Sequence, residues 1–249
     1  GSTNGSRLPI DRDRLAELLG FNGLVLHTRD AMWQSDGPIE LMSAALAVLC
    51  NVDHLTEDLQ IWATSEFNFV ELSDSHSRSS VIMPQKKNPY SLTFVRGVAR
   101  EMIGRLAGTA ALQSTPSGQV DNRIFTYSMV PKGLMQTKLA LKLLSATVSG
   151  LTVNKDEMRL ATVKSLGGST DLAEEILTKY GIDAKTANSI VGRAVRSATQ
   201  MGKELEADLI NSAAKDIINR SLNMSDDIIG KIMDPKAILA TRTGPGLHW

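Results

Sequence analysis

The chain has 249 residues, which is enough for one large domain or two smaller ones. Its 27 basic and 27 acidic residues cancel, so bulk charge favours neither nucleic acid nor a membrane surface as a partner. Cys50 is the only cysteine, which excludes a disulfide within the chain and fits a reducing compartment. No apolar run approaches the ~20 residues of a spanning helix, so we expect a cytoplasmic protein.

Only 4% of the residues are aromatic, and the abundant Leu, Ala and Met favour helices packed on helices. Residues 1–38 read as an entry segment with one short helix over Asp11–Gly20. From Ile39 to Trp62, apolar residues recur at steps of three and four, which predicts a helix of about six turns. Apolar residues also lie off that stripe, so we expect this helix to be buried on more than one side.

Two further long helices are predicted in the first part of the chain. One runs from about Tyr90 to Leu112, with Pro89 as its first residue and Asn88 as its N-cap. The other runs from about Pro131 to Ser149. Together with the helix before them, they predict a bundle segment over 39–150.

The sequence changes character at Gly150, where shorter helical stretches begin. Gly181 is suited to end one of them and Asp183 to cap the next, and Ser169 or Thr170 can cap the one before. We therefore expect an all-α chain with a small C-terminal helical domain over 151–249. Its predicted helices cover 155–163, 171–180, 184–202, 206–219 and 226–233.

The chemistry of the chain concentrates in a Ser-rich loop over 73–89, between two of the long helices. Lys86 and Asn88 stand beside a helix N-terminus, and ammonium groups and helix N-termini both attract anions. A serine of the loop, with its pKa lowered by that positive field, could act on a bound carboxylate substrate. The alternative is that polar loops contain Ser, Lys and Asn for solubility alone.

The same loop resembles the argininosuccinate lyase branch of the fumarase/aspartase superfamily, whose signature reads Gly-Ser-Ser-x-Met-Pro-x-Lys-x-Asn-Pro. "SSVIMPQKKNP" at Ser79–Pro89 aligns with it, with Ser80 on the first serine, and it departs from the signature at two positions: Ser79 falls on the glycine and Val81 on the second serine. Further landmarks of that branch follow in order along the chain. They are "LPIDRDRLAELLGF" at 8–21, "EFNFVEL" at 66–72, "GLTVNKDEM" at 150–158 and "STDLAEEILTKYGI" at 169–182.

The resemblance implies a lyase that cleaves a succinyl–amine bond and releases fumarate. It places the catalytic base at Ser80 and carboxylate-binding groups at Lys86 and Asn88, on a mobile loop that closes over the substrate. Ser79 and Gln85 adjoin these residues and are expected to contact substrate. Lys87, the other lysine of the loop, is expected to be mainly structural. Positive groups are needed to stabilise the negative charge that develops when the carbon beside a carboxylate loses its proton. That stabilisation is stronger in a site from which water is excluded.

The resemblance also implies a homotetramer in which each active site combines segments of three subunits. Relatives in this branch are about twice as long, so we expect the N-terminal domain of the family pattern to be absent from this chain, and with it the general acid. We expect a small dicarboxylate substrate, no cofactor, no metal, and neither nucleic acid nor membrane as a partner.

The identity of the amine half of the substrate is less clear. "PSGQVDNRIFTY" over 116–127 lacks most polar residues that argininosuccinate lyases usually have there, which favours another N-substituted aspartate, for example one of the ethylenediamine-disuccinate type. Four other residues are candidate substrate contacts. They are His76 in the Ser-rich loop, and Asp121, Asn122 and Arg123 in the loop before the third long helix.

Three alternatives stay open at this stage. The chain could belong to an argininosuccinate lyase proper, or to a cycloisomerase that acts on carboxymuconate. It could also be an inert form of the same fold, either a structural protein of the crystallin kind or an oligomerisation fragment. Retention of Ser80 favours an enzyme over the inert form.

Overall fold

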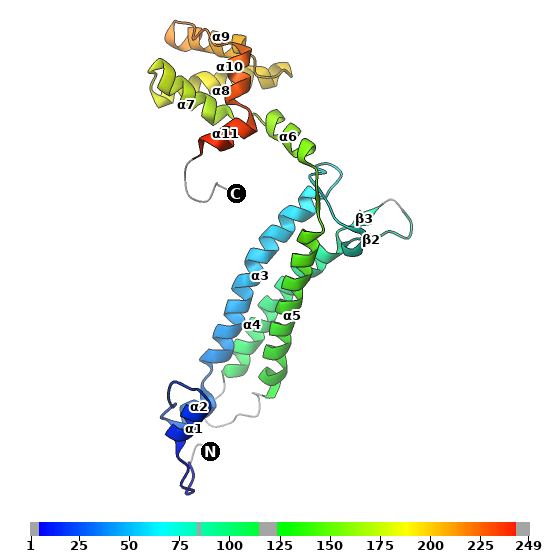
Figure 1. Cartoon of the computed structure of the whole chain (residues 1–249), viewed down its shortest axis with the longest axis vertical. Helices are drawn as coiled ribbons and strands as arrows, with labels where there is room; N and C mark the ends of the chain where they lie inside the picture. The colour runs from blue at the N-terminus through cyan, green and yellow to red at the C-terminus, as the bar shows by residue number, and fades with distance from the viewer. Residues whose placement is uncertain (1–4, 84–85, 115–123, 243–249) are drawn as a thin grey trace. The chain divides into compact units, whose positions relative to one another are not determined.

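The computed structural model describes residues 5–83, 86–114 and 124–242. These residues form eleven α-helices and four strands of two residues each (Figure 1), so the predicted all-α class is confirmed. The chain divides into two compact units, Gly1–Val153 and Asn154–Trp249. Each unit is described below by itself.

Unit 1 starts with two short helices, α1 (Arg12–Leu18) and α2 (Thr28–Trp33). Asp11 caps α1 by accepting a hydrogen bond from the Arg14 amide at 2.9 Å. Gly20 follows the helix with a φ of +73°, a conformation that glycine adopts without a steric penalty. Local cap chemistry therefore sets both ends of α1, and the end near Gly20 is the one that the sequence analysis predicted.

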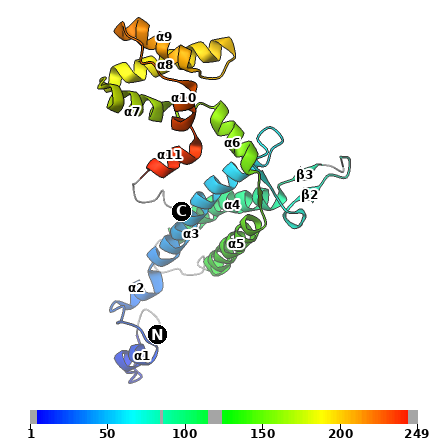
Figure 2. The same cartoon turned by 45° about the horizontal axis from the view of Figure 1, so that its top comes forward.

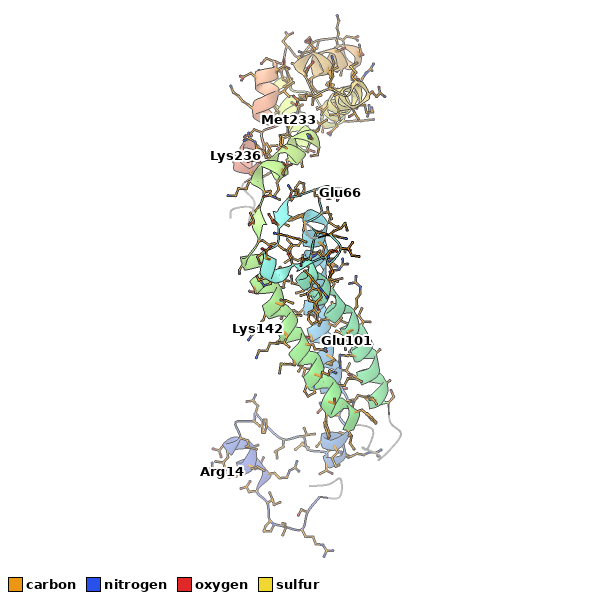
Figure 3. All side chains as sticks on the ribbon, turned by 90° about the vertical axis from the view of Figure 1, so that its right-hand side faces the viewer. Arg14, Glu66, Glu101, Lys142, Met233 and Lys236 are labelled. Atoms are coloured by element: carbon orange, nitrogen blue, oxygen red, sulfur yellow. The ribbon has the colours of Figure 1, made fainter. Side chains whose placement is uncertain are left out.

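Three long helices make up most of unit 1: α3 (Asp36–Trp62), α4 (Tyr90–Gln113) and α5 (Ile124–Ser149). They run side by side in both views of the ribbon (Figures 1 and 2). Exposed side chains such as Glu101 on α4 and Lys142 on α5 project from the bundle (Figure 3). Its core is built from side chains that solvent does not reach, among them Met42, Leu49, Leu92, Val95 and Met102.

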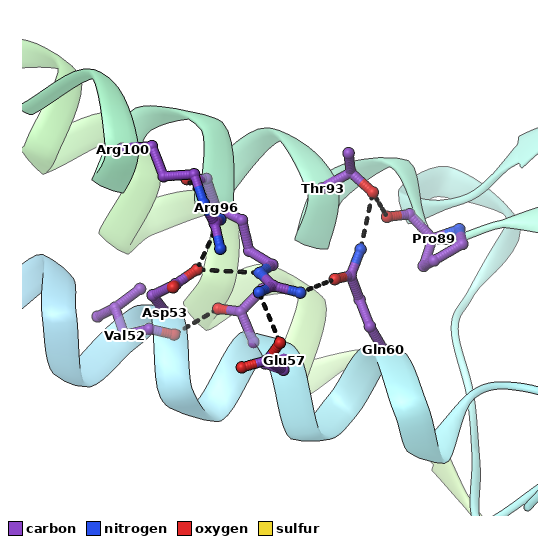
Figure 4. Close-up of polar contacts among 9 residues, drawn as sticks. Val52, Asp53, Glu57, Gln60, Pro89, Thr93, Arg96 and Arg100 are labelled. Atoms are coloured by element: carbon purple, nitrogen blue, oxygen red, sulfur yellow. Dashed lines mark hydrogen bonds and ion pairs between the residues drawn. The ribbon is translucent and has the colours of Figure 1, made fainter.

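A polar network joins α3 to the first turns of α4 (Figure 4). The Arg96 guanidinium donates to Asp53 at 3.0 Å, to Glu57 at 2.8 Å and to Gln60 at 2.8 Å. Gln60 in turn donates to the Thr93 hydroxyl at 2.8 Å, and Thr93 donates to the Pro89 carbonyl oxygen at 3.1 Å. This network fixes the start of α4, immediately after the Ser-rich loop, against α3.

The predicted start of α5 at Pro131 is wrong, because the helix begins seven residues earlier, at Ile124. A proline inside a helix removes one backbone hydrogen bond and strains the preceding turn. Packing compensates here, since Met129 contacts α4 where Gly108 leaves room for it, and Thr109 lies 3.5 Å from the Met129 sulfur. Tertiary contact thus outweighs the local preference for starting a helix at proline.

Unit 2 packs short helices around their own apolar core. They are α6 (Lys155–Lys164), α7 (Ser169–Tyr180), α8 (Ala184–Met201), α9 (Ala207–Ile218), α10 (Asp226–Ile232) and α11 (Pro235–Thr241). Gly181 ends α7 in the left-handed conformation, and Asp183 caps α8 by accepting from the Thr186 amide at 3.0 Å, both as predicted. Gly168, not Ser169 or Thr170, occupies the N-cap position of α7.

The predicted cap at Ser169 or Thr170 is wrong, because α7 already begins at Ser169. A side chain on Gly168 would place its Cβ 2.9 Å from the Met233 Cα, so the backbone of the α6–α7 turn passes against the end of α10. Only glycine permits that approach. The sequence analysis also missed α11, a seven-residue helix that Asp234 caps through the Ala237 amide at 3.1 Å.

Helix α3 has an unusual surface for a helix in a bundle. Leu41, Val48, Leu55 and Ile61 are each more than 40% exposed. Among the described residues, α3 is the one helix that is long and apolar enough to cross a membrane by length and composition, which the sequence analysis did not anticipate. Core helices of other proteins meet the same criterion, so this is weak evidence for a membrane span.

Candidate functional site

The Ser-rich loop folds into a hairpin that projects from one end of the bundle in unit 1 (Figure 1). Strand β2 (Arg78–Ser79) pairs antiparallel with β3 (Lys87–Asn88), so that Ser79 faces Lys87. Ser80 extends the pairing, because its amide donates to the Lys86 carbonyl oxygen at 3.2 Å. This register places Ser80, Lys86 and Asn88 in one small region.

The hydroxyl of Ser80 lies at the entrance of the hairpin turn. Its oxygen accepts hydrogen bonds from the amides of Ile82, at 3.3 Å, and Met83, at 3.2 Å. Backbone donors aimed at a hydroxyl oxygen favour its deprotonated form, since they stabilise negative charge on that atom. The arrangement therefore suits a serine that acts as a base.

Lys86 directly precedes the return strand β3, and Asn88 is part of that strand. Lys86 is exposed and Asn88 is half-buried. Neither side chain makes a hydrogen bond or ion pair with another residue in 5–83, 86–114 or 124–242, so both are available to a ligand. An ammonium and an amide can bind a substrate carboxylate and stabilise the negative charge that develops on it when a basic oxygen removes a proton from the neighbouring carbon.

The predicted N-cap role of Asn88 is wrong. Helix α4 starts at Tyr90, its N-cap residue is Pro89, and no side chain caps it. Asn88 instead pairs with Arg78 across the β2–β3 hairpin. Strand pairing takes the backbone of Asn88 away from the helix, so the loop and α4 are joined by Pro89 alone.

Lys87 forms the strongest ionic contacts of the loop. Its ammonium nitrogen lies 2.8 Å from a carboxylate oxygen of Glu71 and 2.8 Å from one of Asp74. The hydrogen bonds to Asp74 and Glu71 raise the pKa of the lysine, and the bond from Lys87 lowers the pKa of Asp74. We call these three residues the Lys87 cluster.

His76 and Ser79 occupy different parts of the loop. The Nδ1 atom of His76 lies 2.9 Å from the Ser73 hydroxyl and 3.3 Å from the Ser75 hydroxyl. These contacts place His76 in a one-turn 3-10 helix, Asp74–His76, at the base of the hairpin. The Ser79 side chain is exposed on β2, beside Ser80.

Four of the predicted substrate contacts lie outside the described residues. They are Gln85, and Asp121, Asn122 and Arg123, which precede α5 in the sequence. Their roles stay predictions from the sequence.

Sequence reasoning missed two features of this site. One is the pair of backbone donors at Ile82 and Met83, since amides carry no sequence signal. The other is the pair of acidic partners of Lys87. Glu71 and Asp74 lie 16 and 13 residues from Lys87, and a sequence alone gives no reason to pair them with that lysine rather than with Lys86.

Unit 2 contains a cleft of about 770 Å³ between the α6–α7 turn, the turn after α8 and the start of α10. It is lined by groups of both charges, among them Arg159, Lys203, Glu206 and Asp226. Its mixed charge does not match a site for a dicarboxylate. Throughout the part of the chain that the structure describes, no three His, Cys, Asp or Glu side chains form a group suited to a metal ion.

Comparisons with known proteins match the chain to lyases. Residues 1–104 match the family described as "Lyase". Argininosuccinate lyase of Methanocorpusculum labreanum is 33% identical over 97% of this chain and 49% of its own length. That of Oceanobacillus iheyensis is 32% identical over 99% of this chain and 52% of its own length. The chain therefore spans about half the length of the curated relatives it matches.

Solved structures of lyases resemble the chain as well. EDDS lyase in complex with formate is 29% identical to the chain, with a TM-score of 0.87 over 98% of this chain and 49% of its own. A variant of EDDS lyase with bound fumarate gives a TM-score of 0.86. The 3-carboxy-cis,cis-muconate lactonizing enzyme of Pseudomonas putida, at 18% identity and a TM-score of 0.67, shares the fold.

Proposed function

Because the chain belongs to the fumarase/aspartase superfamily and corresponds to a C-terminal portion of its members, we propose that it is part of a carbon–nitrogen lyase. The proposed reaction converts an N-substituted aspartate into fumarate and an amine. The observation that carries the proposal is the Ser80 hydroxyl, whose oxygen accepts two backbone hydrogen bonds in the same hairpin as Lys86 and Asn88, two side chains without a polar partner among the described residues. The relatives named argininosuccinate lyase and EDDS lyase support the reaction class.

The proposed chemistry starts at Ser80. As an alkoxide, its oxygen removes the proton from the carbon beside one carboxylate, and the amides of Ile82 and Met83 stabilise the alkoxide before that transfer. Lys86 and Asn88 bind the carboxylate on which negative charge then develops. The electron pair left by the proton forms the new carbon–carbon double bond as the carbon–nitrogen bond breaks. The amine takes a proton from a general acid that lies outside this set of residues.

We infer that the working enzyme is an assembly of several copies. The exposed apolar side chains of α3 support this inference, because a surface of that kind usually packs against another protein chain. In this superfamily the resemblance implies a homotetramer with shared active sites. On that basis the present chain supplies the proton-abstracting segment, and other segments complete the site.

Absorbance of fumarate in the ultraviolet provides the test. The chain is incubated with fumarate and a panel of amines that includes arginine and ethylenediamine, alone and together with a recombinant N-terminal half of a relative. Loss of fumarate with one amine, in the presence of both halves, would support the lyase and identify the amine. Arginine as that amine would favour argininosuccinate lyase proper, and ethylenediamine would favour an aminopolycarboxylate lyase.

A Ser80→Ala variant tests the base. We expect the rate to fall by about a thousandfold or more, because the variant lacks the oxygen that accepts the proton. Ser189→Ala is the matched control, since it removes an exposed serine hydroxyl of α8. Equal rates in the two variants would refute the role of Ser80. A folded assembly with no activity on any amine would favour the inert, structural alternative.

A further inference from the structure

The base of the hairpin rests on the end of helix α5 through two separate elements. Strand β1 (Val70–Glu71) pairs antiparallel with β4 (Thr152–Val153), which follows α5 directly. In that register Glu71 faces Thr152. The segment that precedes the hairpin is therefore bound to the segment that leaves the bundle.

The second contact with α5 is made by the 3-10 helix at 74–76. A Cβ added to Gly150, the residue after α5, would lie 3.3 Å from the Ser73 hydroxyl and 3.6 Å from Nδ1 of His76. Glycine at this position lets the 3-10 helix sit close to the last turn of α5. The hydrogen bonds of Ser73 and Ser75 to His76 close that turn.

Lys87 connects the hairpin to both of these elements. Of its two carboxylate partners, Glu71 lies on β1 and Asp74 lies on the 3-10 helix. Lys87 itself is on β3, directly opposite Ser79 and next to Lys86, whose carbonyl oxygen accepts from the Ser80 amide. One ammonium group thus joins the strand that orients Ser80 to the two elements that are fixed on α5.

We propose that Lys87 is a positioning residue, which holds the hairpin on the α5 end and keeps the Ser80 amide paired with the Lys86 carbonyl oxygen. Its role is distinct from that of Lys86, whose side chain has no partner among the described residues and binds the ligand in the proposed function. The significance of Ser80 for chemistry rests on that proposed function, but the effect of Lys87 on the hairpin does not. An isolated exposed ion pair usually contributes little, whereas this lysine is shared by carboxylates from two anchored elements.

Amide hydrogen exchange measures the hairpin without any need for activity. The amides of Ser80 and Lys86 are both hydrogen-bonded within the hairpin, the latter to the Met83 carbonyl oxygen at 2.9 Å. In a Lys87→Met variant of the full chain, we expect these amides to exchange roughly fivefold faster, since local opening controls their exchange. The amides of α4 and α9 should exchange as in the wild type.

The matched control is Lys231→Met, which removes an equally short ion pair, with Asp227 at 2.8 Å, on the exposed face of α10. It should leave exchange in the hairpin unchanged. Lys87→Arg keeps the charge and should restore most of the protection. Raised salt should accelerate exchange in the wild-type hairpin but not in Lys87→Met, because salt screens exposed charges. If the hairpin amides exchange at the same rate in Lys87→Met and in Lys231→Met, the proposal is overturned.

Kinetics of the complemented enzyme separate this proposal from the proposed function. We expect Lys87→Met to lower kcat about tenfold to a hundredfold through misplacement of the base, with little change in KM. Lys86→Met, in contrast, should raise KM, since it removes a ligand contact. If Ser80→Ala stays active while exchange responds to Lys87→Met, the proposed function fails and the positioning role stands. If exchange does not respond, the positioning role fails whatever the activity.

Discussion

The two units bury their apolar residues in different ways. Unit 2 has a closed core, in which residues such as Leu172, Ile190 and Ile210 are inaccessible to solvent, and most of its large apolar side chains pack against that core. Unit 1 has a core too, yet α3, α4 and α5 all leave large apolar side chains exposed, for example Leu55, Phe94 and Leu139. Unit 2 buries most of its large apolar side chains in its own core. Unit 1 leaves many of them exposed, which is typical of a subunit that packs against another protein chain.

The largest expected effect contrasts two aliphatic side chains, one from each unit. Ile210→Ala should lower the free energy of unfolding of unit 2 by about 2–5 kcal/mol, because it removes a fully buried side chain and leaves a cavity. Leu55→Ala removes a side chain that is 45% exposed and should change the unfolding of unit 1 by less than about 1 kcal/mol. Denaturation in urea, followed by circular dichroism, measures both.

The same pair also tests assembly. Leu55→Ala should weaken self-association in analytical ultracentrifugation, whereas Ile210→Ala should affect folding first. If Leu55→Ala and the wild type associate equally, this part of α3 faces solvent in the working protein. The inference that unit 1 packs against another protein chain would then lose its main support.

The next largest expected effect is the change in stability when a glycine at a helix contact is replaced by alanine. Gly168→Ala should destabilise unit 2 by about 1–3 kcal/mol, because its Cβ would meet the backbone of Met233. Gly230→Ala, within α10, meets nothing within 4 Å and should stabilise the same unit by up to about 1 kcal/mol. Thermal unfolding of both variants measures the difference in sign, and a loss of stability in both would contradict the steric account.

The matching position in unit 1 is Gly133 of α5. Its added Cβ would meet the Met42 side chain at 2.9 Å, at the terminal methyl group. A methionine tip can move where a backbone cannot, so we expect Gly133→Ala to cost less than Gly168→Ala. The reverse order would indicate that the bundle core is packed more rigidly than the core of unit 2.

The smallest effect concerns acid stability. The hydroxyl and amide of Thr186 donate to Asp183 and lower the pKa of this capping carboxylate. A carboxylate with a lowered folded pKa adds stability above its unfolded value, about pH 3.9, and that stability is lost as the pH falls through the folded pKa. Unit 2 should therefore weaken more steeply between pH 5 and pH 3 in the wild type than in Asp183→Asn, which keeps the cap but cannot titrate. Urea midpoints across that range measure it, and parallel curves would rule out a contribution from Asp183.

Much of the helical structure was accessible from the sequence because its determinants are local. Periodic apolar residues predicted α3, and Asp11, Gly181 and Asp183 marked helix ends through hydrogen bonds or conformations within a few residues. The loop signature around Ser80 could likewise be recognised from the sequence, because it depends on residue types at fixed spacing. Where a distant contact decides the outcome, as for Pro131 inside α5, the prediction failed.

By itself, then, the sequence determined the all-α class, the family resemblance and the identity of the candidate base. The tertiary structure alone decided how that base is held. Lys87 contacts Glu71 and Asp74, 16 and 13 residues away, where the β2–β3 pairing brings this lysine back beside the segment that precedes the hairpin. The physical reason is that these contacts join groups whose proximity is set by folding of the backbone, and no residue type at a single position encodes it.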